Sequence, residues 1–246
     1  MSPNTSESVA CRQGAHAALV TLFGIVTSGP LALLVLQVCW PQPAWQSAAE
    51  FARHFHVAQS LPYLAGLFLV SGYVMLIASL HALAAPEQRP ATTAALIFAA
   101  AYAALICFNY MVQTTFVPSL ARSFEPSHAL ALGMWSMVHP RSLAWGVELW
   151  GYACLGMATW LVAPVLAGRA RRSPAAVWAF RANGLVSIAA ALWMVVEPGW
   201  AVTPLGLAAF AVWNVLAFVM SWLAFDVLRS GFREPATRIQ PALRSC

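Results

Sequence analysis

The chain of 246 residues has little charge and no lysine. Only 9% of its residues are charged, 61% are hydrophobic, and the mean hydropathy is +0.70. An ordinary soluble domain has about 25% charged and about 45–50% apolar residues, because its surface must meet water. The composition therefore excludes a soluble globular enzyme and a disordered chain, and it predicts a multi-span membrane protein.

The basic residues are 13 arginines, which oppose 8 acids and give a formal net charge of +5 and a pI near 9.3. In a membrane protein, such a balance is typical of cytoplasmic loops that lie against anionic lipid. We therefore expect the lipid bilayer, and not a nucleic acid, to be the partner. A basic set made only of arginine also indicates a GC-rich bacterial genome.

The five cysteines are scattered, and no C-x-x-C pair is present to support a zinc knuckle or a redox dithiol. His54 and His56 are the closest pair of histidines, but residues two apart on a helix point away from each other. No pattern of a serine hydrolase, a zinc protease, a Walker A loop or a dinucleotide-binding turn occurs in an interpretable context. We expect no metal and no cofactor.

Six apolar stretches are long enough to cross a hydrocarbon core of about 30 Å, which takes roughly 20 helical residues. They lie near 16–39, 61–85, 92–117, 143–167, 177–197 and 205–228. The first exceeds the apolar core of a signal peptide, about 7–15 residues, so we expect a retained span with a kink at Gly29-Pro30. The prediction is an all-α, polytopic bundle of six transmembrane helices over 16–228, between an N-terminal tail (1–15) and a C-terminal tail (229–246).

The placement of the arginines predicts the orientation of the spans. Most of them lie in the two tails and in the loops 86–91 and 168–176, whereas the opposite loops hold only Arg53, Arg122 and Arg141. Positive residues favour the cytoplasmic side, so both tails are predicted to be cytoplasmic, which agrees with an even number of spans. We expect a multi-pass protein of the bacterial inner (plasma) membrane.

The two long connections, 40–60 and 119–142, are then expected on the outer side. Tryptophans favour the headgroup region, and five lie at or near this boundary: Trp40, Trp45, Trp145, Trp150 and Trp200. Within the second connection, the apolar segment 127–138 is too short to span the membrane. We expect it to form a surface-lying or re-entrant helix.

Polar side chains inside the spans are the informative exceptions, because lipid offers them no hydrogen-bond partner. Glu148 lies about 8 Å below the outer boundary of the fourth span, at about 1.5 Å per residue, and Tyr152 shares its helix face. In the third span, Gln113 and Asn109 lie about 6 and 12 Å deep, and a spacing of four places them on one face. Asn214, about 13 Å down the sixth span, is predicted to complete the cluster.

This cluster has two interpretations. A structural clamp would fix the register of the helices through interhelical hydrogen bonds of about 0.6 kcal/mol each. A functional site is favoured by the carboxyl group of Glu148, because acids at such a depth usually line a cavity or a proton path.

Three short runs in the third and fourth spans form a further pattern: Asn109-Tyr110-x-x-Gln113, Trp145-x-x-Glu148-x-x-Gly151-Tyr152 and Gly156-x-Ala158-Thr159. This pattern resembles a largely uncharacterised group of bacterial six-span membrane proteins of unknown function. The resemblance covers most of the chain in topology and the third and fourth spans in motif. It implies a six-helix bundle with a shared polar cluster, and it implies no reaction, substrate or cofactor.

We expect a non-enzymatic membrane protein that binds or moves a small or lipidic molecule. Its outer-facing polar pocket is predicted to be lined by Asn109, Gln113, Glu148, Tyr152 and Asn214. One alternative is an intramembrane enzyme acting on an isoprenoid or a lipid, with Glu148 as the acid, by analogy with the architecture of membrane terpene cyclases. A second alternative is a structural subunit of a larger membrane assembly, in which Glu148→Gln would be tolerated.

Overall fold

The computed structural model describes residues 5–230, and these residues form helices and short connections without strands. Helix accounts for 85% of the structure. Six helical segments are long and apolar enough to cross a membrane: Ser6–Cys39, Val57–Ala82, Pro86–Arg122, Leu143–Leu166, Ser173–Val196 and Pro204–Ser230. The predicted all-α bundle of six spans is confirmed, and the chain is a multi-pass membrane protein by the length and composition of its helices.

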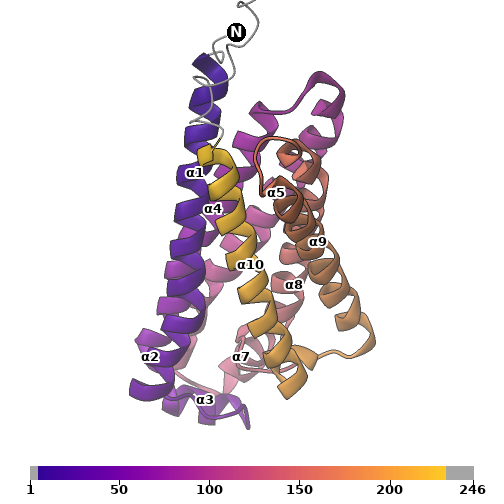
Figure 1. Cartoon of the computed structure of the whole chain (residues 1–246). Helices are drawn as coiled ribbons and strands as arrows, with labels where there is room; N and C mark the ends of the chain where they lie inside the picture. Colours follow the sequence, from indigo (N-terminus) through magenta and orange to yellow (C-terminus); the bar gives the residue numbers. More distant parts are fainter. Residues whose placement is uncertain (1–4, 231–246) are drawn as a thin grey trace, which may run out of the picture.

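The main helices of the spans are α1 (Thr5–Val26), α4 (Leu61–Ala82), α5 (Arg89–Met111), α8 (Leu143–Val162), α9 (Ser173–Val196) and α10 (Pro204–Ser230). Each packs on the next in this order, and α10 packs on α1, so the six helices form a closed ring. Figure 1 shows the last turns of α10 beside α1, at the end where the N-terminus lies. We call this end of the bundle the terminal end.

The first helix begins at Thr5, eleven residues before the predicted span. Because the helix continues through 16 without a break, the N-terminal tail predicted over 1–15 is helical in its described part. On which side of the membrane this part lies stays a prediction. Of the predicted C-terminal tail, the residues beyond Ser230, including Arg233, Arg238 and Arg244, lie outside the described residues.

Two spans are interrupted by a wider π-helical turn, each beside a proline. The turn η1 (Thr27–Leu31) contains Pro30 and leads into α2 (Ala32–Cys39), and the turn η4 (Val112–Phe116) precedes Pro118 in α6 (Val117–Arg122). A proline has no N–H and its ring crowds the carbonyl four residues earlier, so the helix must widen or bend. The break predicted at Gly29-Pro30 is the first of these turns, and the sequence analysis missed the second.

Hydroxyl groups in these turns donate to carbonyls of the preceding helical turn. In the first turn, Thr27 donates to the carbonyl of Phe23 at 2.7 Å. In the second, Thr114 donates to the carbonyl of Tyr110 at 2.8 Å and Thr115 to that of Met111 at 2.6 Å. Both interruptions are therefore compatible with an apolar environment, where an unpaired carbonyl is costly.

The end opposite the termini is closed by the long connections, and Figure 1 shows α3 and α7 there. The connections contain α3 (Ala48–His54), η2 (Val57–Ser60), η5 (Pro126–His128) and α7 (Ala129–Trp135). Residues from both connections and from the third span share a second hydrophobic cluster, separate from the main core: Ala48, Phe51, Val112, Val117, Ala121 and Leu132. We call the segments 40–60 and 117–142 the cap, and this end of the bundle the capped end.

The segment 127–138 contains the short helix α7 and does not span the membrane, as expected. Helix α7 has one buried residue, Leu132, which belongs to the cluster of the cap. After Trp135 the chain runs without regular helix until α8 begins at Leu143. Met137 in this irregular stretch contacts Asn109 and Gln113, two of the predicted site residues.

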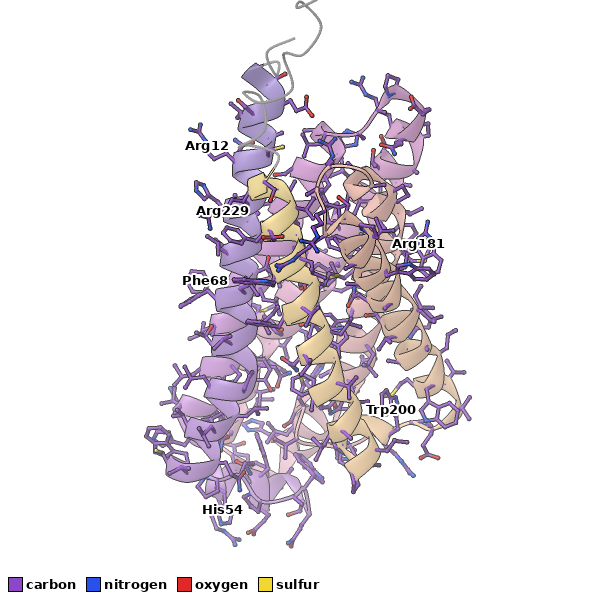
Figure 2. All side chains as sticks on the ribbon, in the orientation of Figure 1. Arg12, His54, Phe68, Arg181, Trp200 and Arg229 are labelled. Atoms are coloured by element: carbon purple, nitrogen blue, oxygen red, sulfur yellow. The ribbon has the colours of Figure 1, made fainter. Side chains whose placement is uncertain are left out.

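The terminal end is held together by Arg169. Its guanidinium group pairs with Glu7 of α1 at 3.1 Å and donates to the carbonyl of Leu83, after α4, at 2.8 Å. Its Nε also donates to the carbonyl of Val165, at 2.7 Å. Figure 2 shows Arg12 and Arg229 at this end and His54 at the capped end.

Candidate functional site

Glu148 lies in the second turn of α8, and its side chain is turned into the bundle. The residue is only 8% exposed. Its Oε2 accepts a hydrogen bond from Nδ2 of Asn109 at 2.8 Å, and its Oε1 accepts one from the hydroxyl of Tyr110 at 3.4 Å. Among residues 5–230, none of the ion pairs involves Glu148. The site therefore holds a buried acid with two neutral donors and no counter-ion.

Gln113 connects this acid to the cap. Its Nε2 donates to Oδ1 of Asn109 at 3.3 Å and to the carbonyl of Trp135 at 2.7 Å. Its Oε1 accepts from the backbone N–H of Met137 at 3.4 Å. Gln113 belongs to the π turn beside Pro118, so the local break in the third span positions the amide that holds the cap.

Met137 of the cap contacts Asn109, the residue that donates to the buried acid. Its sulfur accepts from Nδ2 of Asn109 at 3.3 Å, and its carbonyl accepts from Nε1 of Trp145 at 2.8 Å. Met137 is half-buried and lies in the irregular stretch before α8. Because a thioether side chain is flexible, Met137 can change its position beside the Asn109 amide at little cost.

All five tyrosines of the chain belong to one chain of contacts that begins at Glu148. The Tyr110 hydroxyl lies 3.4 Å from that of Tyr152, and the ring of Tyr63 lies 5.5 Å from the ring of Tyr110, between centroids. From Tyr152 the contacts continue to Tyr102 (5.6 Å) and from there to Tyr73 (6.4 Å). The hydroxyls of Tyr102 and Tyr73 are buried and have no hydrogen-bond partner among the described residues. Polar groups without partners thus lie beside the acid, deep in an apolar bundle.

The structure brings four of the five predicted site residues together. Asn109, Gln113 and Glu148 share direct hydrogen bonds, and Tyr152 joins them through the hydroxyl of Tyr110. The matching depths inferred from helix spacing are therefore observed as contacts. Whether these residues bind a ligand stays a prediction.

The prediction that Asn214 completes the cluster is wrong in its geometry. Its Nδ2 donates to the carbonyl of Phe210 on its own helix at 2.9 Å, and its Oδ1 lies against Gly29 of the first span. The depth of a residue does not determine the rotation of its helix, and α10 turns Asn214 toward the first span. Its neighbour Trp213 contacts the site instead, with its ring 4.7 Å from that of Tyr152.

Sequence reasoning also missed Tyr110 and the backbone of the cap. Tyr110 follows Asn109 directly, so a regular helix turns its side chain by about 100° from the face of Asn109 and Gln113. The available signal was its place inside the Asn109-Tyr110-x-x-Gln113 run. The carbonyl of Trp135 offers no such signal, because any residue carries one.

A second polar contact lies farther along α8. Nδ2 of Asn183 in α9 donates to the hydroxyl of Thr159 at 3.0 Å, and Thr159 donates to the carbonyl of Gly156 at 3.0 Å. Here the helices are very close, since a Cβ added to Gly184 would lie 2.9 Å from the carbonyl oxygen of Gly156. This contact is neutral and is enclosed by two helices.

Among residues 5–230, no group of three or more His, Cys, Asp or Glu side chains is arranged to hold a metal ion. His54 lies 3.2 Å from Glu50, whereas the ring of His56 stacks on Trp40 with centroids 4.8 Å apart. The two histidines therefore point to different partners. The reason is not their spacing on one helix, because α3 ends at His54 and His56 has an extended backbone.

His139 lies in the cap, outside the spans. Its ring contacts Trp45 edge-to-face at 4.9 Å, and its Nδ1 accepts from the backbone N–H of Arg141 at 3.2 Å. Partial burial lowers the pKa of His139, and the nearby Arg141 charge lowers it further. The neutral imidazole is thus the form that fits the cap.

Comparisons of the chain with protein-family models, with curated proteins and with solved structures give no match. The resemblance to the six-span bacterial group accordingly stays a prediction.

Proposed function

We propose that this protein binds or moves a small or lipidic molecule at the capped end of the bundle, with Glu148 as the central binding group. Asn109 and Gln113 hold the site in place, and Tyr110 and Tyr152 complete it. The proposal includes a bacterial inner membrane with both termini in the cytoplasm. That orientation is supported by the arginines, which are concentrated in the loops and helix ends of the terminal end.

One observation supports the proposal above the others: a carboxyl group is buried without a counter-ion. A structural clamp between helices needs only neutral groups, and this chain builds such a clamp from Thr159 and Asn183. An ionised carboxyl group at Glu148 adds a desolvation penalty of several kcal/mol that a neutral clamp avoids. Ionisable groups are retained at such depth where they act on a ligand, an ion or a proton.

Access to Glu148 runs through the irregular stretch of the cap between Trp135 and Leu143. This stretch is joined to the polar site by a few hydrogen bonds from Gln113, Asn109 and Trp145. Such a segment opens at a much smaller free energy than a transmembrane helix. The ligand therefore enters from the capped end when Met137 moves aside.

The test is native purification in mild detergent followed by mass spectrometry of the molecules that co-purify. We expect a ligand in the wild type and in the control Glu197→Gln, which changes an exposed acid at the end of α9. In Glu148→Gln we expect the co-purifying ligand to be absent. We also expect that the ligand no longer raises the thermal unfolding temperature of this variant. Equal ligand content in all three proteins would overturn the proposal.

The intramembrane enzyme remains the second candidate, because an acid surrounded by tyrosine rings is suited to protonating an apolar substrate. Lipid extracts of cells with wild-type protein and with Glu148→Ala test it. A lipid species that appears or disappears with the acid favours the enzyme, and identical extracts count against it.

A further inference from the structure

We propose that the ligand at Glu148 is a lipophilic monovalent cation, such as an amine or a quaternary ammonium ion with an apolar body. This inference rests on the proposed function and gives the class of its ligand. It is carried by the charge of the site, by the aromatic side chains near it and by the buried hydroxyl of Tyr102.

The charge of the site selects against anions. No arginine or histidine among residues 5–230 makes an ion pair or a hydrogen bond with Glu148. A phosphate or diphosphate headgroup would meet a carboxyl group with no basic residue to receive it. A neutral ligand would leave the ionised form of Glu148 uncompensated, whereas a single positive charge would compensate it in a medium of low dielectric constant.

Aromatic side chains of three helices lie near the acid. Tyr63 of α4, Tyr110 of α5 and Tyr152 of α8 all interact electrostatically with Glu148. Trp213 of α10 closes the group through its contact with Tyr152 at 4.7 Å. A carboxyl group together with the faces of several rings is the chemistry that recognises organic ammonium ions.

The hydroxyl of Tyr102 gives an independent indication of a ligand. Tyr102 is fully buried, its ring contacts that of Tyr152, and its hydroxyl has no hydrogen-bond partner among the described residues. A hydroxyl oxygen accepts hydrogen bonds, so it offers a second acceptor to an N–H donor. Tyr102 also interacts electrostatically with Glu148, so this buried acceptor belongs to the surroundings of the acid.

The same carboxyl group binds either a proton or the cation. The titratable groups that face it are Tyr63, Tyr102, Tyr110 and Tyr152, and none of them carries a positive charge. Lowering the pH therefore weakens cation binding by competition at Glu148. His139→Gln serves as a background for this measurement, because it removes the histidine of the irregular stretch next to the site.

The experiment measures equilibrium binding of three probes to the purified full chain in a neutral detergent. Two are cations of different size, tetraphenylphosphonium and benzyltrimethylammonium, and the third, tetraphenylborate, is an anion with the shape of the first. We expect saturable binding of at least one cation with one site per chain and no saturable binding of the anion. Glu148→Gln lowers the affinity for the cation at least tenfold, and Glu197→Gln leaves it unchanged.

If Glu148→Gln does not elute as a folded protein, Trp213→Leu replaces it and lowers the affinity for the cation about fivefold through the lost ring face. Saturable binding of the anion, or absence of binding by both cations, overturns the inference. If the cations fail while a co-purifying molecule still depends on Glu148, the proposed function stands and only the ligand class is wrong. If neither probes nor co-purifying molecules respond to Glu148→Gln, both proposals are overturned.

Discussion

Glu148 and Thr159 lie on one face of α8, about three turns apart, and each receives a hydrogen bond from an asparagine of a neighbouring helix. Asn109 of α5 donates to Glu148 at 2.8 Å, and Asn183 of α9 donates to Thr159 at 3.0 Å. Both side chains are buried. In burial and in the identity of the donor, the two contacts are the same.

They differ in charge and in what encloses them. The Thr159 contact is neutral and lies where α8 and α9 approach at Gly156 and Gly184. The Glu148 contact is ionisable and is covered by the irregular stretch of the cap around Met137. A buried hydrogen bond by itself therefore does not indicate function. The combination of an uncompensated acid with a cover that can move does.

The largest expected effect is at the helix contact. In Gly184→Leu the new side chain meets the carbonyl of Gly156 and the ring of Trp160, so we expect destabilisation by about 3 kcal/mol or more. Size-exclusion chromatography and thermal unfolding in detergent check this. Gly146→Leu is the matched control, since a Cβ there meets nothing within 4 Å and the protein should behave as the wild type.

The next largest effect measures how much the hydrogen bond between Glu148 and Asn109 contributes to stability. Glu148→Leu leaves the amide of Asn109 without its main acceptor, and we expect a loss of about 1–3 kcal/mol in the free energy of unfolding. The double variant Glu148→Leu/Asn109→Leu should recover part of that loss, because both polar partners are then removed. Denaturant titration of the single and double variants measures the coupling, and additive losses would contradict a direct interaction.

A smaller effect is expected at the second contact. Thr159→Val keeps the shape of the side chain and removes its hydrogen bond from Asn183, at a loss of about 1 kcal/mol. Ligand content and cation binding should remain at wild-type level. A change in either would mean that the Thr159 contact is not merely structural and that the two regions are coupled.

The smallest effect concerns the cap alone. The pKa of His139 is lowered in the folded protein, so the unfolded chain binds the proton more readily. The stability of the cap should therefore be full above about pH 6.5 and decrease as the pH falls through that value. Hydrogen exchange of peptides from 135–142 at several pH values measures this, and in His139→Gln the dependence should be weaker.

The sequence was sufficient for the six spans and for the meeting of Asn109, Gln113 and Glu148. Hydropathy determines the spans, and a spacing of four on one helix determines a shared face. The rotation of α10 depends on tertiary contacts, so Asn214 was misplaced. Tyr110 was missed because a regular helix turns its side chain away from the face of Asn109 and Gln113. The contacts of the cap with Gln113 could not be predicted, because they use backbone groups of Trp135 and Met137, which any residue carries.

Polar contacts of Arg169 join the segments of the terminal end, whereas apolar packing joins the segments of the cap. The bonds of Arg169 to Glu7 and to the carbonyl of Leu83 join three separate segments, and one of them is an exposed ion pair. Such pairs weaken with ionic strength, over a screening length of about 8 Å in physiological salt, whereas apolar packing does not. Salt should accordingly loosen the first turns of α1. At the opposite end it should weaken the pair of Glu50 and Arg53 within α3 and leave the apolar packing of the cap undisturbed.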